Sequence, residues 1–481
     1  MNTTRPEPRP PAGVAIGAAL LLAAAAILPF IGRASLSNDE GWSLAFARLP
    51  WPTLWTATHH LDAVFLPYYA LLHVWLALGD SAALLRFPSA LAILASLPVA
   101  YAIARRLFDP VVAAVAVLLL ACNPFLVFHA KDARPYGLAF LLCAVATLAF
   151  LRVLESPTRA NGFAYALAAA LAVYAHAFGA FVIVAHAAST PVLPRAAGAP
   201  RVVALALFGA LVACAPLVAL IHTAGSAQIG WIAHPGPRDW LELVKDLAGG
   251  RIALAAFVFG CAVMLVRARM GRPRAAFDAV VLWFAVPLAL LAIVSYAVEP
   301  VSISRYAIFC VLPLTLATAA AIGEFRRPLV VVATLFLLAV SARIVWTQRS
   351  EDAENYRAAA AYIAAHAAPG DVVAAPEAAF AFAAAQTAVP NVPPLIYPTA
   401  TWQFWLGPQP LSAIAGTQLA HARTVWVVRR GYHQRRPQPA ASAALETLLA
   451  PDFAPAGETD FSYAGVVRYV RVKAATALRR S

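Results

Sequence analysis

Residues 37–67 read S-N-D-E-G-W-S-L-A-F-A-R-L-P-W-P-T-L-W-T-A-T-H-H-L-D-A-V-F-L-P. They directly follow a long apolar segment, residues 13–31. An acidic pair, Asp39 and Glu40, therefore lies close to a membrane surface, and a third acid, Asp62, comes later in the same stretch. We expect the rest of the chain to form a membrane scaffold around this acidic segment.

The composition is that of a polytopic membrane protein. The 481 residues are 62% hydrophobic and only 12% charged, with a mean hydropathy of +0.73. Soluble domains carry about 25% charged residues. The first apolar run, residues 13–31, is longer than the roughly 7–15 residues of a signal-peptide core, so we expect a retained first helix.

The five cysteines all fall inside apolar segments. A free thiol in such a place behaves as a small apolar residue. The sequence therefore predicts neither a disulfide framework nor a cysteine metal site. The residues are Cys122, Cys143, Cys214, Cys261 and Cys310.

Charge in the loops predicts the orientation of the chain. With the N-terminus inside, the inner segments carry fourteen basic residues and five acids, and the outer loops before residue 340 carry nine of each. This bias follows the positive-inside rule. We therefore interpret the net charge of +13 as a topology signal in a cell-membrane protein with a cytoplasmic N-terminus, not as a nucleic-acid patch. The eleven predicted spans are residues 13–31, 87–104, 111–128, 137–154, 162–176, 178–193, 202–221, 252–268, 276–298, 306–323 and 328–346.

We predict two domains: a transmembrane domain at residues 1–346, with its first outer loop at 32–86, and a soluble extracytoplasmic domain at 347–481. Residues 65–78 are apolar but short for a span, and a crossing there would reverse the charge bias. Their aromatic residues suit a helix that lies at the outer membrane surface.

The C-terminal 130 or so residues have the pattern of a small α/β domain. A helical pattern at 358–367 precedes strand-like segments at 372–375, 424–430 and 463–472. The Pro-rich segment at 390–410, with Trp402, Phe404 and Trp405, predicts an irregular loop.

Asp39 and Glu40 are the first candidates for chemistry. A carboxylate can accept a proton from an acceptor hydroxyl, and partial desolvation near lipid would raise its basicity. Trp42, Phe46 and Trp51 crowd the pair. The alternative is that both are solvated loop acids that cap a helix.

A second group of candidates lies at residues 129–138, H-A-K-D-A-R-P-Y-G-L, between the third and fourth predicted spans. Lys131, Asp132 and Arg134 at one helix mouth can bind a phosphate and orient a base. The alternative is a basic loop that reaches lipid headgroups.

Two further outer segments carry single cations or histidines. His176 lies in Y-A-H-A-F-G, and Arg305 with Tyr306 lies in E-P-V-S-I-S-R-Y. Each could instead be an interface residue or a helix anchor. The four segments together place carboxylates and cations on one predicted face, and no phosphate-binding glycine loop supports a nucleotide site. The candidate substrate-binding residues are His60, Asp62, Tyr68, Lys131, Arg134, Tyr136, His176, Arg305 and Tyr306.

These motifs, in this order, resemble the membrane-embedded GT-C glycosyltransferases of the protein O-mannosyltransferase type (glycosyltransferase family 39). This group includes lipid A aminoarabinose transferases, and the sequence is also similar to actinobacterial mannosyltransferases. The resemblance covers about residues 30–323. It rests on N-D-E-G-W, D-A-V-F-L-P-Y-Y-A-L-L-H-V-W, L-R-F-P-S-A-L, K-D-A-R-P-Y-G-L, Y-A-H-A-F-G and S-R-Y.

The resemblance implies that a monosaccharide, mannose or a pentose, arrives on polyprenyl phosphate at the outer face and passes with inversion to a lipid, glycan or protein acceptor. Asp39 would be the base, Asp132 the second-loop acid, and Arg305 the ligand of the donor phosphate. The sequence departs from many relatives at L-D-A-V, where they carry a proline pair or a lysine. The scheme requires no metal or other cofactor, and leaves a divalent ion near the acids open.

Two other functions stay open on the sequence. Many spans and a basic inner face also suit a lipid or glycolipid transporter, although transporters usually carry ionisable groups or broken helices near the membrane midplane. A non-catalytic glycolipid-binding protein is the third alternative.

Overall fold

A computed structural model describes residues 12–224, 232–270, 274–349, 354–398, 419–430 and 440–472. Residues 399–410 of the predicted irregular loop, with Trp402, Phe404 and Trp405, lie outside these residues. The chain divides into two compact units. The first comprises residues 1–31, 62–68 and 86–349, and the second comprises 32–61, 69–85 and 350–481.

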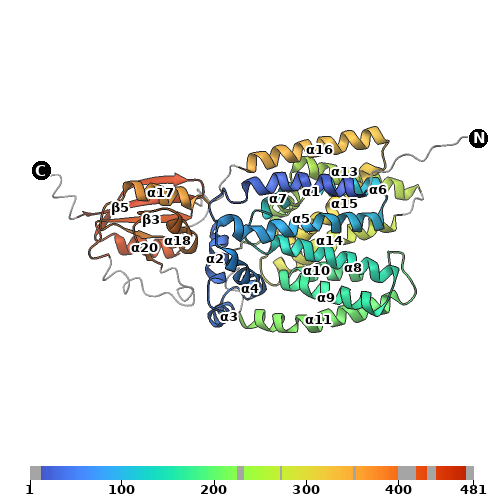
Figure 1. The fold of residues 1–481 in the computed structure, drawn as a ribbon, viewed down its shortest axis with the longest axis horizontal. Helices are drawn as coiled ribbons and strands as arrows, with labels where there is room; N and C mark the ends of the chain where they lie inside the picture. The colour runs from blue at the N-terminus through green and yellow to red at the C-terminus, as the bar shows by residue number, and fades with distance from the viewer. Residues whose placement is uncertain are drawn as a thin grey trace, which may run out of the picture. The chain divides into compact units, whose positions relative to one another are not determined.

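The first unit is a bundle of helices, most of which run side by side with nearly parallel axes (Figure 1). The chain enters it through α1 and leaves it through α16. The helices are α1 (Ala12–Ile27), α5 (Ala82–Leu107), α6 (Pro110–Ala121), α7 (Pro124–His129), α8 (Tyr136–Glu155), α9 (Arg159–Ala175), α10 (Gly179–Ser189), α11 (Ala199–Ala224), α12 (Pro237–Ala248), α13 (Arg251–Arg269), α14 (Ala275–Ala297), α15 (Val311–Gly323) and α16 (Arg327–Gln348).

The polytopic helical architecture is confirmed, but the count of eleven spans is not. Among the described residues, seven helices are long and apolar enough to cross a membrane, and an eighth appears if the bent pair α12–α13 is one span. The span predicted at 111–128 is broken, because Asn123 caps a new helix that starts at Pro124. The helix α10 has only 11 residues. The membrane orientation of the N-terminus and the domain boundary after residue 346 stay predictions.

Helix α15 lies at the centre of the bundle. With the preceding 3-10 helix η4 (Ser304–Cys310), it forms a span of which 94% is buried inside the protein. Its last turns are rich in alanine and glycine, which allow close approach of neighbouring helices. A Cβ added at Gly323 would lie 2.5 Å from Cγ2 of Val112 on α6. Glycine is therefore required at this crossing of α15 and α6.

Gly323→Ala should lower the stability of the protein by about 1–3 kcal/mol, because the added methyl overpacks the α15–α6 contact. The control is Gly17→Ala on α1, where a Cβ would meet nothing within 4 Å. Thermal unfolding of the two variants in detergent measures the difference. Equal melting temperatures would show that Val112 moves aside without cost.

A buried polar cluster joins four helices of the bundle. The Thr147 hydroxyl donates to the Cys143 carbonyl, so it accepts from Nε2 of His186 at 3.0 Å. Nδ1 of His186 then accepts from the Tyr165 hydroxyl at 3.1 Å. Trp283 donates to the Ser189 hydroxyl at 2.9 Å, one turn along the same helix. The histidine is fully satisfied, which is how a polar side chain survives burial.

The second unit contains a five-stranded mixed sheet of strand order β2-β1-β3-β5-β4. β1 pairs in parallel with β2 and β3, whereas β5 is antiparallel to β3 and β4. The strands are β1 (Val372–Ala374), β2 (Leu395–Tyr397), β3 (Thr424–Arg430), β4 (Phe453–Phe461) and β5 (Ala464–Arg471), and the helices of this region are α17 (Tyr356–His366), α18 (Ala379–Ala388) and α20 (Ala440–Leu449).

Both faces of the sheet are covered, as alternation along its strands requires. On one face Trp426 and Val428 of β3 pack in a cluster with residues of α17 and α18. On the other, Val425 and Val427 pack in a cluster with Leu445 and Leu449 of α20. The predicted α/β character and the strands at 372–375, 424–430 and 463–472 are confirmed. The prediction of an irregular loop from residue 390 is wrong at β2.

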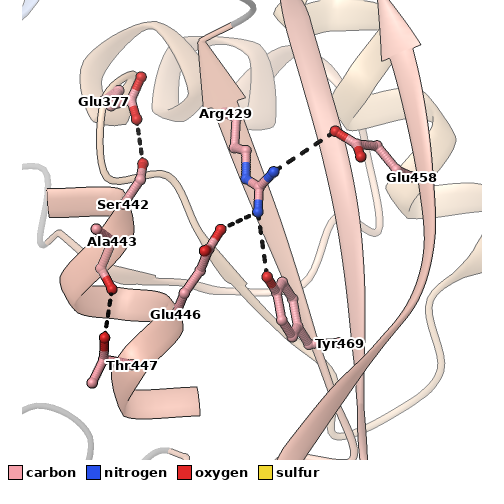
Figure 2. A network of polar contacts seen from close by, with 8 residues as sticks. All are labelled: Glu377, Arg429, Ser442, Ala443, Glu446, Thr447, Glu458 and Tyr469. Carbon is pink, nitrogen blue, oxygen red and sulfur yellow. Dashed lines mark hydrogen bonds and ion pairs between the residues drawn. The ribbon is translucent and has the colours of Figure 1, made fainter. Parts of the chain in front are cut away.

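Polar contacts at one side of this sheet form the network of Figure 2. Arg429 on β3 donates to Glu446 on α20 and to the Tyr469 hydroxyl on β5, and it pairs with Glu458 on β4 at 3.8 Å. Beside it, the Ser442 hydroxyl donates to Glu377. The network therefore ties α20 and both antiparallel strands to the end of β3.

The second unit also contains α2 (Asn38–Ala47), α3 (Trp51–His60) and most of α4 (Leu66–Trp75). The 3-10 helices η2 (Ala63–Phe65) and η3 (Leu76–Leu78) extend α4 into one short apolar helix over Ala63–Leu78. The predicted short helix at 65–78 is confirmed, and its place at the membrane surface stays a prediction.

Candidate active site

The connection between α7 and α8 carries three of the predicted site residues, Lys131, Asp132 and Arg134, and Tyr136 begins α8 directly after it. The first part of this connection is ordered by a contact with the last residue of α7: Nδ1 of His129 lies 3.2 Å from Oδ2 of Asp132. Both side chains are largely buried. Asp132 is therefore held against the imidazole ring of His129.

Arg134, in the connection between α7 and α8, packs against Phe65 of η2. It is 6% exposed, and its guanidinium carbon lies 4.2 Å from the centroid of the Phe65 ring. The Ser89 hydroxyl fixes the same loop by donating to the Arg134 carbonyl at 3.0 Å. A cation over an aromatic face is stabilised electrostatically, and more so when desolvated.

Arg305 approaches the same region from η4, about 170 residues later in the sequence. Its guanidinium carbon lies 5.8 Å from the ring centroids of both Tyr136 and Tyr306. Those two tyrosine rings are 6.4 Å apart. We call Arg134, Tyr136, His176, Arg305 and Tyr306 the arginine–tyrosine cluster.

His176 lies within the cluster, in the turn between α9 and α10. Its ring centroid is 5.8 Å from that of Tyr136 and 5.3 Å from that of Tyr306. Burial, with the charges of Arg134 and Arg305, lowers the pKa of His176 to about 3. The imidazole is therefore neutral at physiological pH. Among the described residues its Nδ1 is buried without a hydrogen-bond partner, so it can bond a ligand.

Lys131 and Arg86 add positive charge to this loop region. Burial, and then the nearby Arg86, lowers the pKa of Lys131. Arg86 is 2% exposed and donates to the Ile31 carbonyl at 3.0 Å. Crowded cations of this kind are stabilised by an anion, and phosphate is a suitable one.

The structure adds one acid that sequence reasoning missed. Asp246, near the end of α12, accepts a hydrogen bond from the Ser304 hydroxyl at 2.8 Å, directly before Arg305. Lys245 pairs with Glu242 on the same helix. The amphipathic segment W-L-E-L-V-K-D at 240–246 was the available signal.

The acidic pair opens helix α2, in the second unit. Ser37 caps the helix: its hydroxyl accepts from the Glu40 N–H, and the Glu40 carboxylate accepts from the Ser37 N–H at 2.9 Å. Glu40 is 3% exposed. Asp39 is partly exposed in the first turn, where the helix N-terminus favours a negative charge. The two acids therefore have different surroundings.

The remaining predicted substrate-binding residues, His60, Asp62 and Tyr68, differ in their local structure. His60 is exposed at the end of α3. Asp62 has a left-handed backbone, with φ of 57°, and its carbonyl accepts from the Phe65 N–H. Tyr68 is 1% exposed on α4. Their substrate-binding roles stay predictions.

No group of three or more His, Cys, Asp or Glu that could hold a metal ion occurs within the described residues. The metal-independent scheme stays a prediction.

Solved structures similar to this chain are membrane glycosyltransferases. ArnT from Cupriavidus metallidurans, bound to undecaprenyl phosphate, matches with a TM-score of 0.58 and 14% identity, over 95% of this chain and 97% of that one. The Archaeoglobus fulgidus oligosaccharyltransferase matches with a TM-score of 0.50 and 12% identity, over 86% and 68%. The chain has the GT-C glycosyltransferase fold. The mycobacterial arabinofuranosyltransferase AftD shares this fold with a TM-score of 0.50 and 17% identity, over 95% of this chain and 41% of that one.

Part of the chain also matches a sequence family. Its description is "Dolichyl-phosphate-mannose-protein mannosyltransferase", and it matches residues 63–220. This segment contains Arg134, Tyr136 and His176, whereas Asp39 and Arg305 lie outside it. No curated protein sequence matches the chain at a significant level.

Proposed function

We propose that this protein is an inverting glycosyltransferase that moves a monosaccharide from a polyprenyl-phosphate donor to an acceptor at the outer membrane face. The observation that carries the proposal is the arginine–tyrosine cluster. Two guanidinium groups, from loops far apart in the sequence, lie with a neutral imidazole and two phenol rings. The undecaprenyl phosphate of the similar ArnT structure supports a donor of this class.

The cluster suits the leaving group of this reaction. When the bond from the sugar C1 to the phosphate oxygen breaks, the bonding electrons stay on the phosphate. That oxygen needs charge stabilisation more than a proton, because a phosphate monoester is a stable anion at neutral pH. Arg134 and Arg305 would supply it as preorganised donors in a water-poor environment. His176 Nδ1 would hold a further oxygen.

Asp39 is the proposed base. Its carboxylate would take the proton from the acceptor hydroxyl as that oxygen attacks the sugar C1 from the face opposite the phosphate. We assign Glu40 to the helix cap instead, because its carboxylate is buried and bonded to Ser37. Asp132, held by His129, is the supporting acid. We propose mannose and arabinose as the first donor sugars to test.

A lipid transporter is the second candidate, and one observation favours it. Helices α12 and α13 are bent by 92° at Gly249 and Gly250, and broken helices are common in transporters. In this chain the break lies next to Asp246, which bonds to Ser304 beside Arg305. We therefore interpret the bend as part of the donor-phosphate region.

The test is transfer of radiolabelled sugar from synthetic polyprenyl-phosphate mannose or arabinose by the purified full-length protein. Lipid-linked or glycan product that depends on protein and time supports the proposal. The transporter alternative predicts instead movement of a fluorescent polyprenyl phosphate across proteoliposomes without product.

A further inference from the structure

The first turn of α2 is bonded to an acid of the C-terminal sequence. The Asn38 N–H, one residue before Asp39, donates to Oε2 of Glu354. Oε1 of the same carboxylate accepts from Nε of Arg430 at 2.8 Å. Glu354 is 8% exposed. A buried carboxylate of this kind is stable only with both partners in place.

Glu354 is itself fixed to the sheet. Its backbone forms an antiparallel bridge with Ser462, in the turn between β4 and β5. Arg430 is the last residue of β3. Glu354 therefore joins α2 to two separate points of the sheet, through its carboxylate at Arg430 and through its backbone at Ser462, and α2 cannot shift without disturbing these contacts.

Close packing completes the contact between α2 and the α/β part of the second unit. A Cβ at Gly41 would lie 2.5 Å from the backbone nitrogen of Ala381 on α18. The ring of Trp42 meets that of Phe380 edge to face, with centroids 4.9 Å apart. Three residues before α2 begins, Ser35 accepts a hydrogen bond from the Arg357 N–H at 3.2 Å.

We infer that the Arg430–Glu354 pair is a positioning device for Asp39, and that the C-terminal domain serves catalysis by holding the acidic helix in register. The inference rests on the proposed function, in which Asp39 is the base. Glu354 and Arg430 touch neither substrate nor reacting atoms in this scheme. They act through the backbone of Asn38, which fixes the direction of the first turn. A displacement of a catalytic group by about 1 Å can lower the rate about 100-fold.

The experiment compares two neighbouring arginines on β3 in the full-length protein. Arg430→Met and Glu354→Leu remove the pair, whereas Glu354→Gln keeps an oxygen that can accept from the Asn38 N–H. Arg429→Met is the matched control, because its contacts run to Glu446, Glu458 and Tyr469 within the sheet and α20 (Figure 2).

Two readouts separate positioning from general damage: kcat and KM with polyprenyl-phosphate sugar, and backbone hydrogen exchange of residues 37–47. Arg430→Met and Glu354→Leu should speed exchange of these residues and lower kcat by about 10–100-fold at unchanged donor KM. Glu354→Gln should recover part of the loss. Arg429→Met should leave both the kinetics and the hydrogen exchange of residues 37–47 unchanged.

Three outcomes would overturn the inference. Unchanged exchange in Arg430→Met and Glu354→Leu would show that the pair does not hold α2. Faster exchange with unchanged kcat would leave the pair a structural contact only, and an equal effect of Arg429→Met would indicate general destabilisation. If the wild-type protein transfers no sugar, the catalytic role of the pair fails with the proposed function, while exchange still reports whether the pair orders α2.

Discussion

Asp39→Asn should lower the rate of sugar transfer by about 10²–10⁴-fold, the usual contribution of a general base. Asparagine keeps the size of the side chain and part of its hydrogen bonding, but it cannot take a proton from the acceptor. Binding of the donor should survive, because the proposed donor ligands are the cations and tyrosines of the first unit. Radiolabelled sugar transfer, with donor binding measured in parallel, checks both parts.

Two variants serve as controls for Asp39→Asn, and a third tests the supporting acid. Glu40→Gln should retain most activity, because a glutamine can accept from the Ser37 N–H in the same capping box. Asp80→Asn changes an exposed acid that pairs with Arg48, so it should have no effect. Asp132→Asn should lower the rate less than Asp39→Asn does. If Asp132→Asn causes the larger loss, the two acids exchange roles, and if neither variant loses activity, the site is elsewhere.

The sequence predicted a shared membrane face for the members of the arginine–tyrosine cluster, from loop charge and a count of eleven spans that is not confirmed. Lys131–Tyr136, His176 and Arg305 each follow or precede an apolar segment, and the charge bias put all of them outside. The structure brings Arg134, Tyr136, His176, Arg305 and Tyr306 into one cluster. The contact of Arg134 with Phe65 could not be predicted, because the two residues are about 70 positions apart and no local pattern pairs them.

The sequence around Glu40 contained a helix-capping signal, but Glu40 was interpreted first as a catalytic candidate, with helix capping as the alternative. The pattern S-N-D-E at residues 37–40 is that of a capping box, in which the serine caps the helix and the glutamate returns to the serine backbone. The structure contains this arrangement. In the proposal, Glu40 therefore caps the helix and Asp39 acts as the base.

The contacts of Glu354 could not be predicted from the sequence, for a different reason. Its partners, Asn38 and Arg430, are 316 and 76 residues away along the chain, and no local pattern encodes such a pairing. β4 was missed because its sequence, F-A-P-A-G-E-T-D-F, contains a proline and a glycine and is mostly exposed. An edge strand of this kind lacks the apolar alternation by which half-buried strands are recognised.

Arg305→Met and Arg134→Met should each lower kcat by about 10²–10³-fold, the usual effect of removing one preorganised donor from a developing anion. Each loss would fall on the step in which negative charge collects on the phosphate. Because both guanidinium groups lie in one cluster with His176, the double variant should lose less than the product of the two single losses. Steady-state kinetics with polyprenyl-phosphate sugar gives these values.

The lysine variants separate charge from geometry at the same positions. Arg305→Lys keeps the positive charge but cannot donate two parallel hydrogen bonds. Compared with Arg305→Met, it should therefore bind the donor more tightly but recover little of the lost kcat. Arg195→Met is the control, because that guanidinium donates to the Thr190, Pro191 and Leu193 carbonyls near its own loop. Its kinetics should be those of the wild type. Wild-type kinetics in both Arg305→Met and Arg134→Met would mean that the two arginines only anchor their helices, and the donor phosphate would then need other cations.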